Sequence, residues 1–120
     1  MKSYLIVGGS SDIGGILCRN LLDEGAAVTL LARDSSRLAE FSEDEVSEFI
    51  GDANDAELVK EAVVSAISAG NGRVEGVVHL VGSFAVRPPH AMSPESFEEV
   101  IKTNLSSAFV TLSVLSLIHI

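Results

Sequence analysis

The residues best suited to chemistry lie near the start of the chain, where the apolar run Tyr4–Val7 leads into Gly-Gly-Ser-Ser-Asp-Ile-Gly at positions 8–14. Glycines at a strand-to-helix turn let backbone amides approach a phosphate, and the helix N-terminus favours an anion. The loop therefore predicts a pyrophosphate site, with a turn that needs glycine only for its conformation as the alternative. No Gly-Lys-Ser/Thr ends the loop, which excludes a P-loop, and the step from Gly8 to Gly14 does not fit Gly-x-Gly-x-x-Gly.

The elements that must position this loop follow from an alternation of short apolar runs and helical patterns. Strands are expected at Tyr4–Val7, Val28–Leu31, Glu48–Ile50 and Val77–Val81. Helical patterns end at Gly25 and Gly70, and a further helix is expected to start at the cap Ser93-Pro94. Right-handed parallel crossovers then predict a doubly wound, Rossmann-like α/β sheet of about four strands in the order 3-2-1-4. The segment Phe41–Ser47, with three consecutive acidic residues, is expected to be a solvated connection.

Composition and charge limit the classes of function. The 120 residues are 47% hydrophobic and 21% charged, which is typical of one globular domain. With 17 acidic against 8 basic residues, the net charge of -9 argues against nucleic-acid binding and favours small molecules. Cys18 is the only cysteine and is expected to be buried in a reducing compartment. The first apolar run is too short for a signal peptide or a membrane span, so we expect a cytoplasmic protein without membrane contact or a metal site.

The segment Val7–Gly14 resembles the Thr-Gly-x-x-x-Gly-x-Gly loop of the short-chain dehydrogenase/reductase family. Two of the three glycines match, while Val7 stands at the usual Thr and Asp12 at the middle Gly. We expect the Asp12 side chain to turn away from the pyrophosphate and to cap the first helix. The resemblance implies cofactor binding by the residues of this loop, with hydroxyl groups from its two serines: Gly8, Gly9, Ser10, Ser11, Ile13 and Gly14.

The resemblance continues after the second and third strands. NAD-dependent relatives usually carry an acid at the place of Ala32, whereas Arg33 lies one place later, as in NADP-dependent relatives. A guanidinium there can pair with the 2′-phosphate, so the resemblance implies NADP(H) in preference to NAD(H). An ordinary surface arginine is the alternative. Asp52-Ala53 matches the pair that usually holds adenine, although Asp52 could equally be a turn or capping residue.

The fourth strand departs from the family pattern. His79-Leu80-Val81-Gly82 stands where relatives commonly have Asn-Asn-Ala-Gly, so only Gly82 keeps its expected backbone contact with the cofactor. His79 could replace one of the lost amide hydrogen bonds, or it could be an ordinary core histidine.

The segment Thr103–Phe109 closely resembles the Asn segment of the family, especially that of 3-oxoacyl-[acyl carrier protein] reductases. The resemblance makes Asn104 a catalytic residue, one of a tetrad of Asn, Ser, Tyr and Lys, which holds a water that links the Lys to solvent. The alternative is a core amide that bonds nearby backbone. Relatives commonly pair through this helix, which implies a homo-oligomer for the intact parent protein.

The chemistry that the family implies is hydride transfer between nicotinamide and a carbonyl or alcohol substrate, with a Tyr as proton donor. The family's Ser and Tyr-x-x-x-Lys are expected beyond this chain, whose single tyrosine is Tyr4, so the chain alone should be inactive. Residues 115–120 match the translation of a transposon adapter used for sequencing libraries, with an ordinary apolar helix end as the alternative. We therefore expect an incomplete NAD(P)-binding domain at 1–114 and a non-native tail at 115–120. A non-catalytic nucleotide-binding module is the second functional hypothesis.

Overall fold

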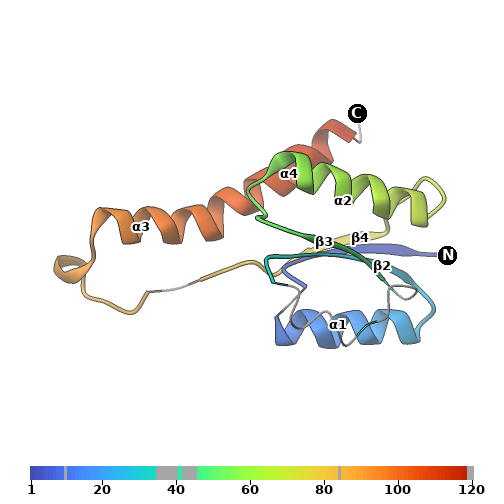
Figure 1. The fold of residues 1–120 in the computed structure, drawn as a ribbon, viewed down its shortest axis with the longest axis horizontal. Helices are drawn as coiled ribbons and strands as arrows, with labels where there is room; N and C mark the ends of the chain where they lie inside the picture. Colours follow the sequence, from blue (N-terminus) through green and yellow to red (C-terminus); the bar gives the residue numbers. More distant parts are fainter. Residues whose placement is uncertain (10, 35–40, 42–45, 84, 119–120) are drawn as a thin grey trace.

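A single parallel sheet organises the molecule. The computed structural model describes residues 1–9, 11–34, 41, 46–83 and 85–118. Its strands are β1 (Ser3–Val7), β2 (Ala27–Ala32), β3 (Val46–Ile50) and β4 (Gly76–His79), and they pair in the order β3-β2-β1-β4 (Figure 1). This order and the α/β fold confirm the prediction from the sequence. The fourth strand ends at His79, two residues earlier than expected.

Helices cover the two faces of the sheet. α1 (Asp12–Asp23) lies on one face, while α2 (Ala56–Ala69) and α4 (Ser107–Ile118) lie on the other (Figure 1). Neighbouring residues of β2 face opposite cores, because Leu30 packs in the cluster that contains Cys18 and Leu31 packs in the cluster that contains Val59. Leu30, Leu31 and Cys18 are all essentially inaccessible, so the expected burial of Cys18 is confirmed. Burying each leucine stabilises the fold by about 1.5–3 kcal/mol.

The connection into β3 differs from the expectation. Val46 and Ser47 open the strand, so they are not part of a solvated linker. Phe41 is also buried, with the Arg19 guanidinium 4.8 Å from its ring centre. Although three of its seven residues are acidic, the segment contributes two apolar side chains, Phe41 and Val46, to the core on the α1 face of the sheet. The rest of the segment, residues 42–45, lies outside the described part of the chain.

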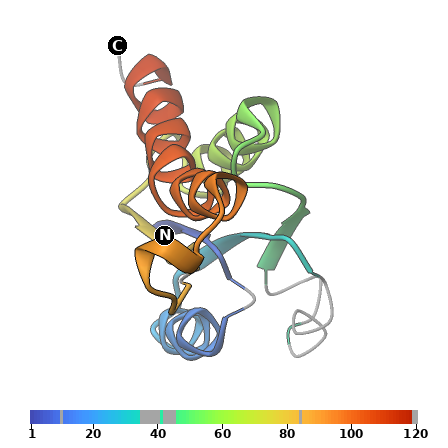
Figure 2. The same ribbon diagram turned by 90° about the vertical axis from the view of Figure 1, so that its left-hand side faces the viewer.

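A long helical run begins after the short 3-10 turn Pro89–Ala91 and crosses the molecule. It consists of α3 (Pro94–Ile101), a π-helical turn (Lys102–Ser106, the π turn) and α4. Ser93 Oγ accepts a hydrogen bond from Ser96 N at 3.1 Å, which confirms the predicted helix start. α4 packs on α2 over the sheet, whereas α3 projects beyond the sheet, as the two ribbon views show (Figures 1 and 2).

One face of this run carries exposed large apolar side chains at intervals of about one helical turn. We call this set the apolar stripe: Phe97, Ile101, Leu105, Phe109 and Leu112. The run Pro94–Ile118 is long and apolar enough to cross a membrane by length and composition alone. Core helices of soluble proteins, which are mostly buried, pass the same test. In this run Val114 is buried in the core beside α2, but only 17% of the apolar window is buried. The expectation of no membrane contact stays a prediction.

Candidate nucleotide-binding site

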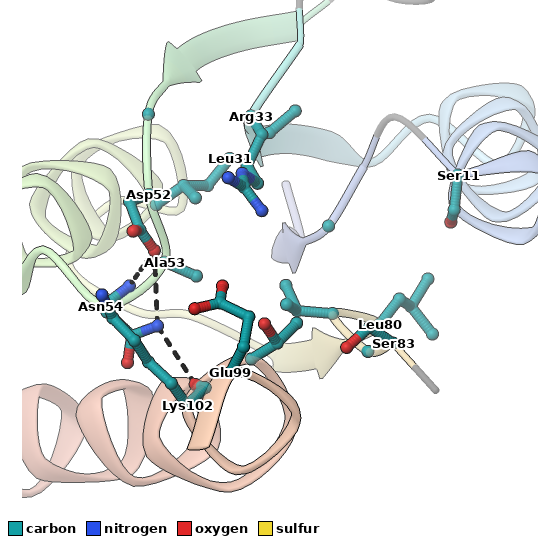
Figure 3. A pocket seen from close by; sticks show the side chains of 16 residues that line it. Ser11, Leu31, Arg33, Asp52, Ala53, Asn54, Leu80, Ser83, Glu99 and Lys102 are labelled. Carbon is teal, nitrogen blue, oxygen red and sulfur yellow. Dashed lines mark hydrogen bonds between the residues drawn. The ribbon is translucent and has the colours of Figure 1, made fainter. Parts of the chain in front are cut away.

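A cavity of about 450 Å³ lies where the four strands end. Each strand is followed by a residue or turn that lines it: Gly8 after β1, Arg33 after β2, Asp52 after β3 and Gly82 after β4. Figure 3 shows Arg33 and Asp52 at this edge of the cavity. The carboxyl ends of the strands are the edge at which open α/β sheets bind ligands, and the volume is that of a small-molecule site. The fold thus brings side chains that are far apart in the sequence to one rim.

The predicted site residues divide into two groups. Six of the predicted cofactor-binding residues line the cavity: Gly8, Ser11, Arg33, Asp52, Ala53 and Gly82. Gly9, Ile13 and Gly14 belong to the same loop and to the start of α1, while Ser10 lies outside the described residues. Lining residues that the sequence analysis missed include Asn54, Leu80 and three from the helical run: Glu99, Lys102 and Thr103. The last three are spaced three and four residues apart and so lie on one face of the helix. This spacing could have indicated that they line the same site.

The glycines of the first loop are explained by the packing of the loop itself. Gly8 has a φ of +94°, and a Cβ there would lie 2.9 Å from the Leu80 carbonyl carbon. A Cβ at Gly9 would lie 2.8 Å from Leu30 Cδ2, and one at Gly14 would lie 3.0 Å from the Gly8 oxygen. Substitution at any of the three requires the neighbouring atoms to move. The glycines are therefore needed for the conformation and packing of the turn, which is the alternative stated in the sequence analysis.

Most amides of the loop already have acceptors. Gly8 N and Gly9 N both donate to the Leu31 oxygen, at 2.7 and 3.2 Å. The amide of Ile13 makes no hydrogen bond with any other described residue, and it lies in the first turn of α1. The first amides of a helix and its dipole favour an anion. In the described part of the chain, an anion would therefore meet the start of α1 and not the Gly8 and Gly9 amides.

Ser11 is the N-cap of α1. Its Oγ accepts a hydrogen bond from Gly14 N at 3.0 Å, and its backbone is extended, as a cap requires. The prediction that Asp12 caps this helix is therefore wrong, because Asp12 is the first residue inside it. Its carboxylate interacts favourably with the positive end of the helix dipole. Ser11 also lines the cavity, and its hydroxyl keeps one hydrogen that it can donate.

Asp52 accepts hydrogen bonds from its own turn. Asn54 N lies 2.9 Å and Asn54 Nδ2 3.4 Å from Asp52 Oδ1. The backbone hydrogen bond is the main reason that the pKa of Asp52 lies below its ordinary value of 3.8, against a smaller opposing effect of burial. The positive charges of Arg33 and Lys102 lower this pKa further. Asp52 thus stabilises its own turn, which was one of the two roles considered from the sequence. Its charged carboxylate is also a hydrogen-bond acceptor at the cavity.

Asn104 lies in the π turn and holds the loop after β4. Its Nδ2 donates to the oxygens of Val100 and Ser83, both at 2.8 Å, and its Oδ1 accepts from Ser83 N at 3.1 Å. Gly82 allows this contact, because a Cβ there would lie 2.9 Å from Asn104 Oδ1. These are the hydrogen bonds of a side-chain amide that pairs with nearby backbone groups, and both hydrogens on Nδ2 have carbonyl partners. The relay role of Asn104 stays a prediction.

His79 faces the helical run and not the cavity lining. Its Nε2 lies 3.1 Å from Ser107 Oγ, and its buried Nδ1 has no hydrogen-bond partner among the described residues. Burial lowers the pKa of this imidazole, so the neutral form is favoured. The contacts are those of a core histidine that ties β4 to α4.

The fold and the strand-end cavity are those of a Rossmann-like α/β protein. The family model for short chain dehydrogenases matches residues 2–117. The 3-dehydrosphinganine reductase TSC10B of Arabidopsis thaliana is 32% identical over 115 residues, which are 90% of this chain and 33% of that protein. The acetoacetyl-CoA reductase of an Acinetobacter species is 30% identical over 116 residues, 90% of this chain and 46% of that protein.

Solved structures agree with this match. A short-chain dehydrogenase/reductase from Serratia marcescens superposes with a TM-score of 0.81 at 25% identity, covering 96% of this chain and 49% of that chain. The chain belongs to the short-chain dehydrogenase/reductase family, a family of oxidoreductases with nicotinamide cofactors. It spans between a third and a half of the length of these relatives.

Proposed function

We propose that the intact protein is an NADP(H)-dependent oxidoreductase that transfers hydride between nicotinamide and a small carbonyl or alcohol substrate. The observation that carries this proposal is a cavity at the strand ends with Arg33 on its rim and Ala32, in place of an acid, at the end of β2. Residues 1–114 supply the cofactor-binding half in this proposal, and 115–120 are an adapter-encoded tail. We further propose a cytoplasmic homo-oligomer.

The residues around the cavity fit a dinucleotide phosphate. The start of α1, with the Ile13 amide, suits the pyrophosphate, and Arg33 suits the 2′-phosphate. Asp52 is a charged acceptor for the amine of adenine, beside the buried Ala53. Gly82 lines the β4 end of the cavity. The bound cofactor would supply or accept the hydride, while these residues bind and orient it.

Proton transfer needs residues that this chain does not contain. Its one tyrosine, Tyr4, is in β1, and no lysine follows it at the spacing of Tyr-x-x-x-Lys. We propose that the Ser, Tyr and Lys lie in further chain of the intact protein, and that the 120-residue chain is inactive alone. Asn104 would bind a water through the second lone pair of its Oδ1.

The test is Arg33→Ala in the full-length protein. Because hydrogen bonds to a charged group contribute about 1.5–3 kcal/mol, Arg33 should favour NADP over NAD by roughly ten- to a hundredfold, and the substitution should remove most of this preference. Arg73→Ala is the matched control, since Arg73 is an exposed arginine paired with Glu75. Dissociation constants from calorimetry give the ratio. Tighter binding of NAD by the wild type, or an unchanged ratio in the Arg33 variant, would refute the assignment.

A non-catalytic nucleotide-binding module is the second candidate. The specific observation in its favour is His79, which stands where relatives commonly have an amide and points to Ser107 in place of the cavity lining. The reading frame beyond Val114 separates the two candidates. A Ser followed by Tyr-x-x-x-Lys supports the oxidoreductase. NADP binding without these residues supports the module.

A further inference from the structure

We propose that Glu99 is a specificity-determining residue for the base of the cofactor, and that its carboxylate accepts a hydrogen bond from the 6-amino group of adenine opposite Asp52. This inference rests on the proposed function, because it needs a dinucleotide with its adenine at the Asp52 end of the cavity.

Glu99 reaches the cavity from α3, an element separate from the strand ends. Figure 3 shows its carboxylate pointing into the cavity, toward the space between Ala53 and Leu80. The helix is fixed in this position by a contact to the loop after β3, where Asn54 Nδ2 donates to the Lys102 oxygen at 3.2 Å. Since Asn54 also bonds Asp52, the same side chain sets the place of α3 relative to that acid. The two carboxylates therefore belong to one connected rim.

The Glu99 carboxylate is available to a ligand. Within the described part of the chain it has no hydrogen bond or ion pair, although Lys102 follows it by three residues on the same helix. A carboxylate accepts hydrogen bonds and donates none when it is ionised. The group it can bind in the cavity is therefore a donor.

Adenine presents such a donor, and the cavity can hold its ring. Its 6-amino group offers two hydrogens, which suits two carboxylates that approach from different walls. The apolar Ala53 and Leu80 lie on the walls beside them. Hypoxanthine carries a carbonyl oxygen in place of the amine, so it would set an acceptor against both acids. Because unmatched polar groups weaken binding, the cavity should reject hypoxanthine.

The experiment compares NADPH with nicotinamide hypoxanthine dinucleotide phosphate, its analogue with hypoxanthine in place of adenine. Dissociation constants are measured by calorimetry on the full-length protein and on the variant Glu99→Gln, which keeps the shape of the side chain. The wild type should prefer NADPH by about tenfold, and Glu99→Gln should reduce this preference to about threefold or less, because the glutamine amide can donate to the hypoxanthine oxygen. Glu98→Gln, an exposed neighbour outside the cavity lining, should leave the preference unchanged.

Three results would count against the inference. An unchanged preference in Glu99→Gln, while Arg33→Ala still abolishes NADP selectivity, would overturn it and leave the proposed function standing. Tighter binding of NADPH relative to NADH in Glu99→Gln would place the carboxylate beside the 2′-phosphate instead of the base. Failure of the wild type to bind either dinucleotide would refute the proposed function, and the inference with it.

Discussion

Asn104→Ala tests whether the π turn holds the loop after β4. The substitution removes two hydrogen bonds to the Ser83 backbone and one to Val100 O. At a net 0.5–1.5 kcal/mol each, and with water able to replace part of the exposed Ser83 bonds, the free energy of unfolding should fall by about 2 kcal/mol. For a protein of the size of the relatives this corresponds to a melting temperature lower by roughly 4–8 °C.

The catalytic measurements use the same variant in the full-length enzyme. If Asn104 also holds the proposed water, turnover should fall at least about tenfold, while the dissociation constant of NADP changes less than about threefold. Asn20→Ala is the control, because Asn20 is an exposed asparagine of α1 outside the cavity lining. Thermal melting, calorimetry and steady-state kinetics are run in parallel on both variants.

Two outcomes would refute this reasoning in different ways. An unfolding free energy within about 0.5 kcal/mol of the wild type would show that the hydrogen bonds to Ser83 contribute nothing measurable. If activity falls only in proportion to the amount of folded protein, Asn104 acts as a core amide, and the proposed role in proton relay is refuted. Asn104→Asp adds a check, because it keeps the acceptor for Ser83 N but sets a carboxylate against the carbonyls of Ser83 and Val100. It should be at least as unstable as Asn104→Ala.

Three further predictions follow from local geometry. Gly82→Ala should weaken cofactor binding and lower the stability of the fold, because the added Cβ would lie 2.9 Å from Asn104 Oδ1. Gly15→Ala has open space around the added Cβ and should raise the free energy of unfolding by about 0.5–1 kcal/mol. Urea unfolding of both variants tests this prediction, and equal effects would contradict it. Because the pKa of Asp52 is lowered in the folded protein, its charged form stabilises the fold above about pH 4, and this contribution is lost as the pH falls through the lowered pKa. Asp52→Asn should therefore flatten the dependence of the unfolding free energy on pH in acid. Parallel plots of unfolding free energy against pH for the wild type and the variant would refute this prediction. The 120-residue chain should self-associate through the apolar stripe and the outer edge of β4, and light scattering that shows a monodisperse monomer would contradict this.

The sheet could be predicted because burial on both faces leaves a direct record in the sequence. Leu30 and Leu31 are adjacent and both inaccessible, as expected of a strand that is covered on two sides. The end of β4 could not be predicted in the same way. Leu80 and Val81 are as apolar as the strand residues, but β1 ends at Val7, and Leu80 N makes the last bond to that residue. Where a strand stops depends on its neighbour, which the local sequence does not contain.

The site was predictable where it depends on the strands and was missed where it depends on the approach of a helix. Arg33 follows β2 directly and Asp52 lies two residues after the end of β3, so their place at one edge of the sheet results from the fold. Glu99 and Lys102 carry no comparable local signal. They enter the cavity because Asn54 binds Lys102 O across 48 residues, a contact that depends on the packing of α3 and the π turn against the loop after β3.

The π turn explains how one helix can serve both walls of the cavity. Ser107 N bonds the Lys102 oxygen five residues back, and that wide turn leaves room for the same oxygen to accept from Asn54. Two residues later, the Asn104 side chain makes hydrogen bonds with the Ser83 backbone on the opposite wall. The loop after β3 and the loop after β4 are therefore tied to a single turn of helix. A regular α-helix would change the direction of Asn104 relative to Lys102, so the two contacts would not keep their present geometry. The π turn thus connects the two walls of the cavity, and a substitution that straightens it should loosen the Asp52 end and the β4 end together.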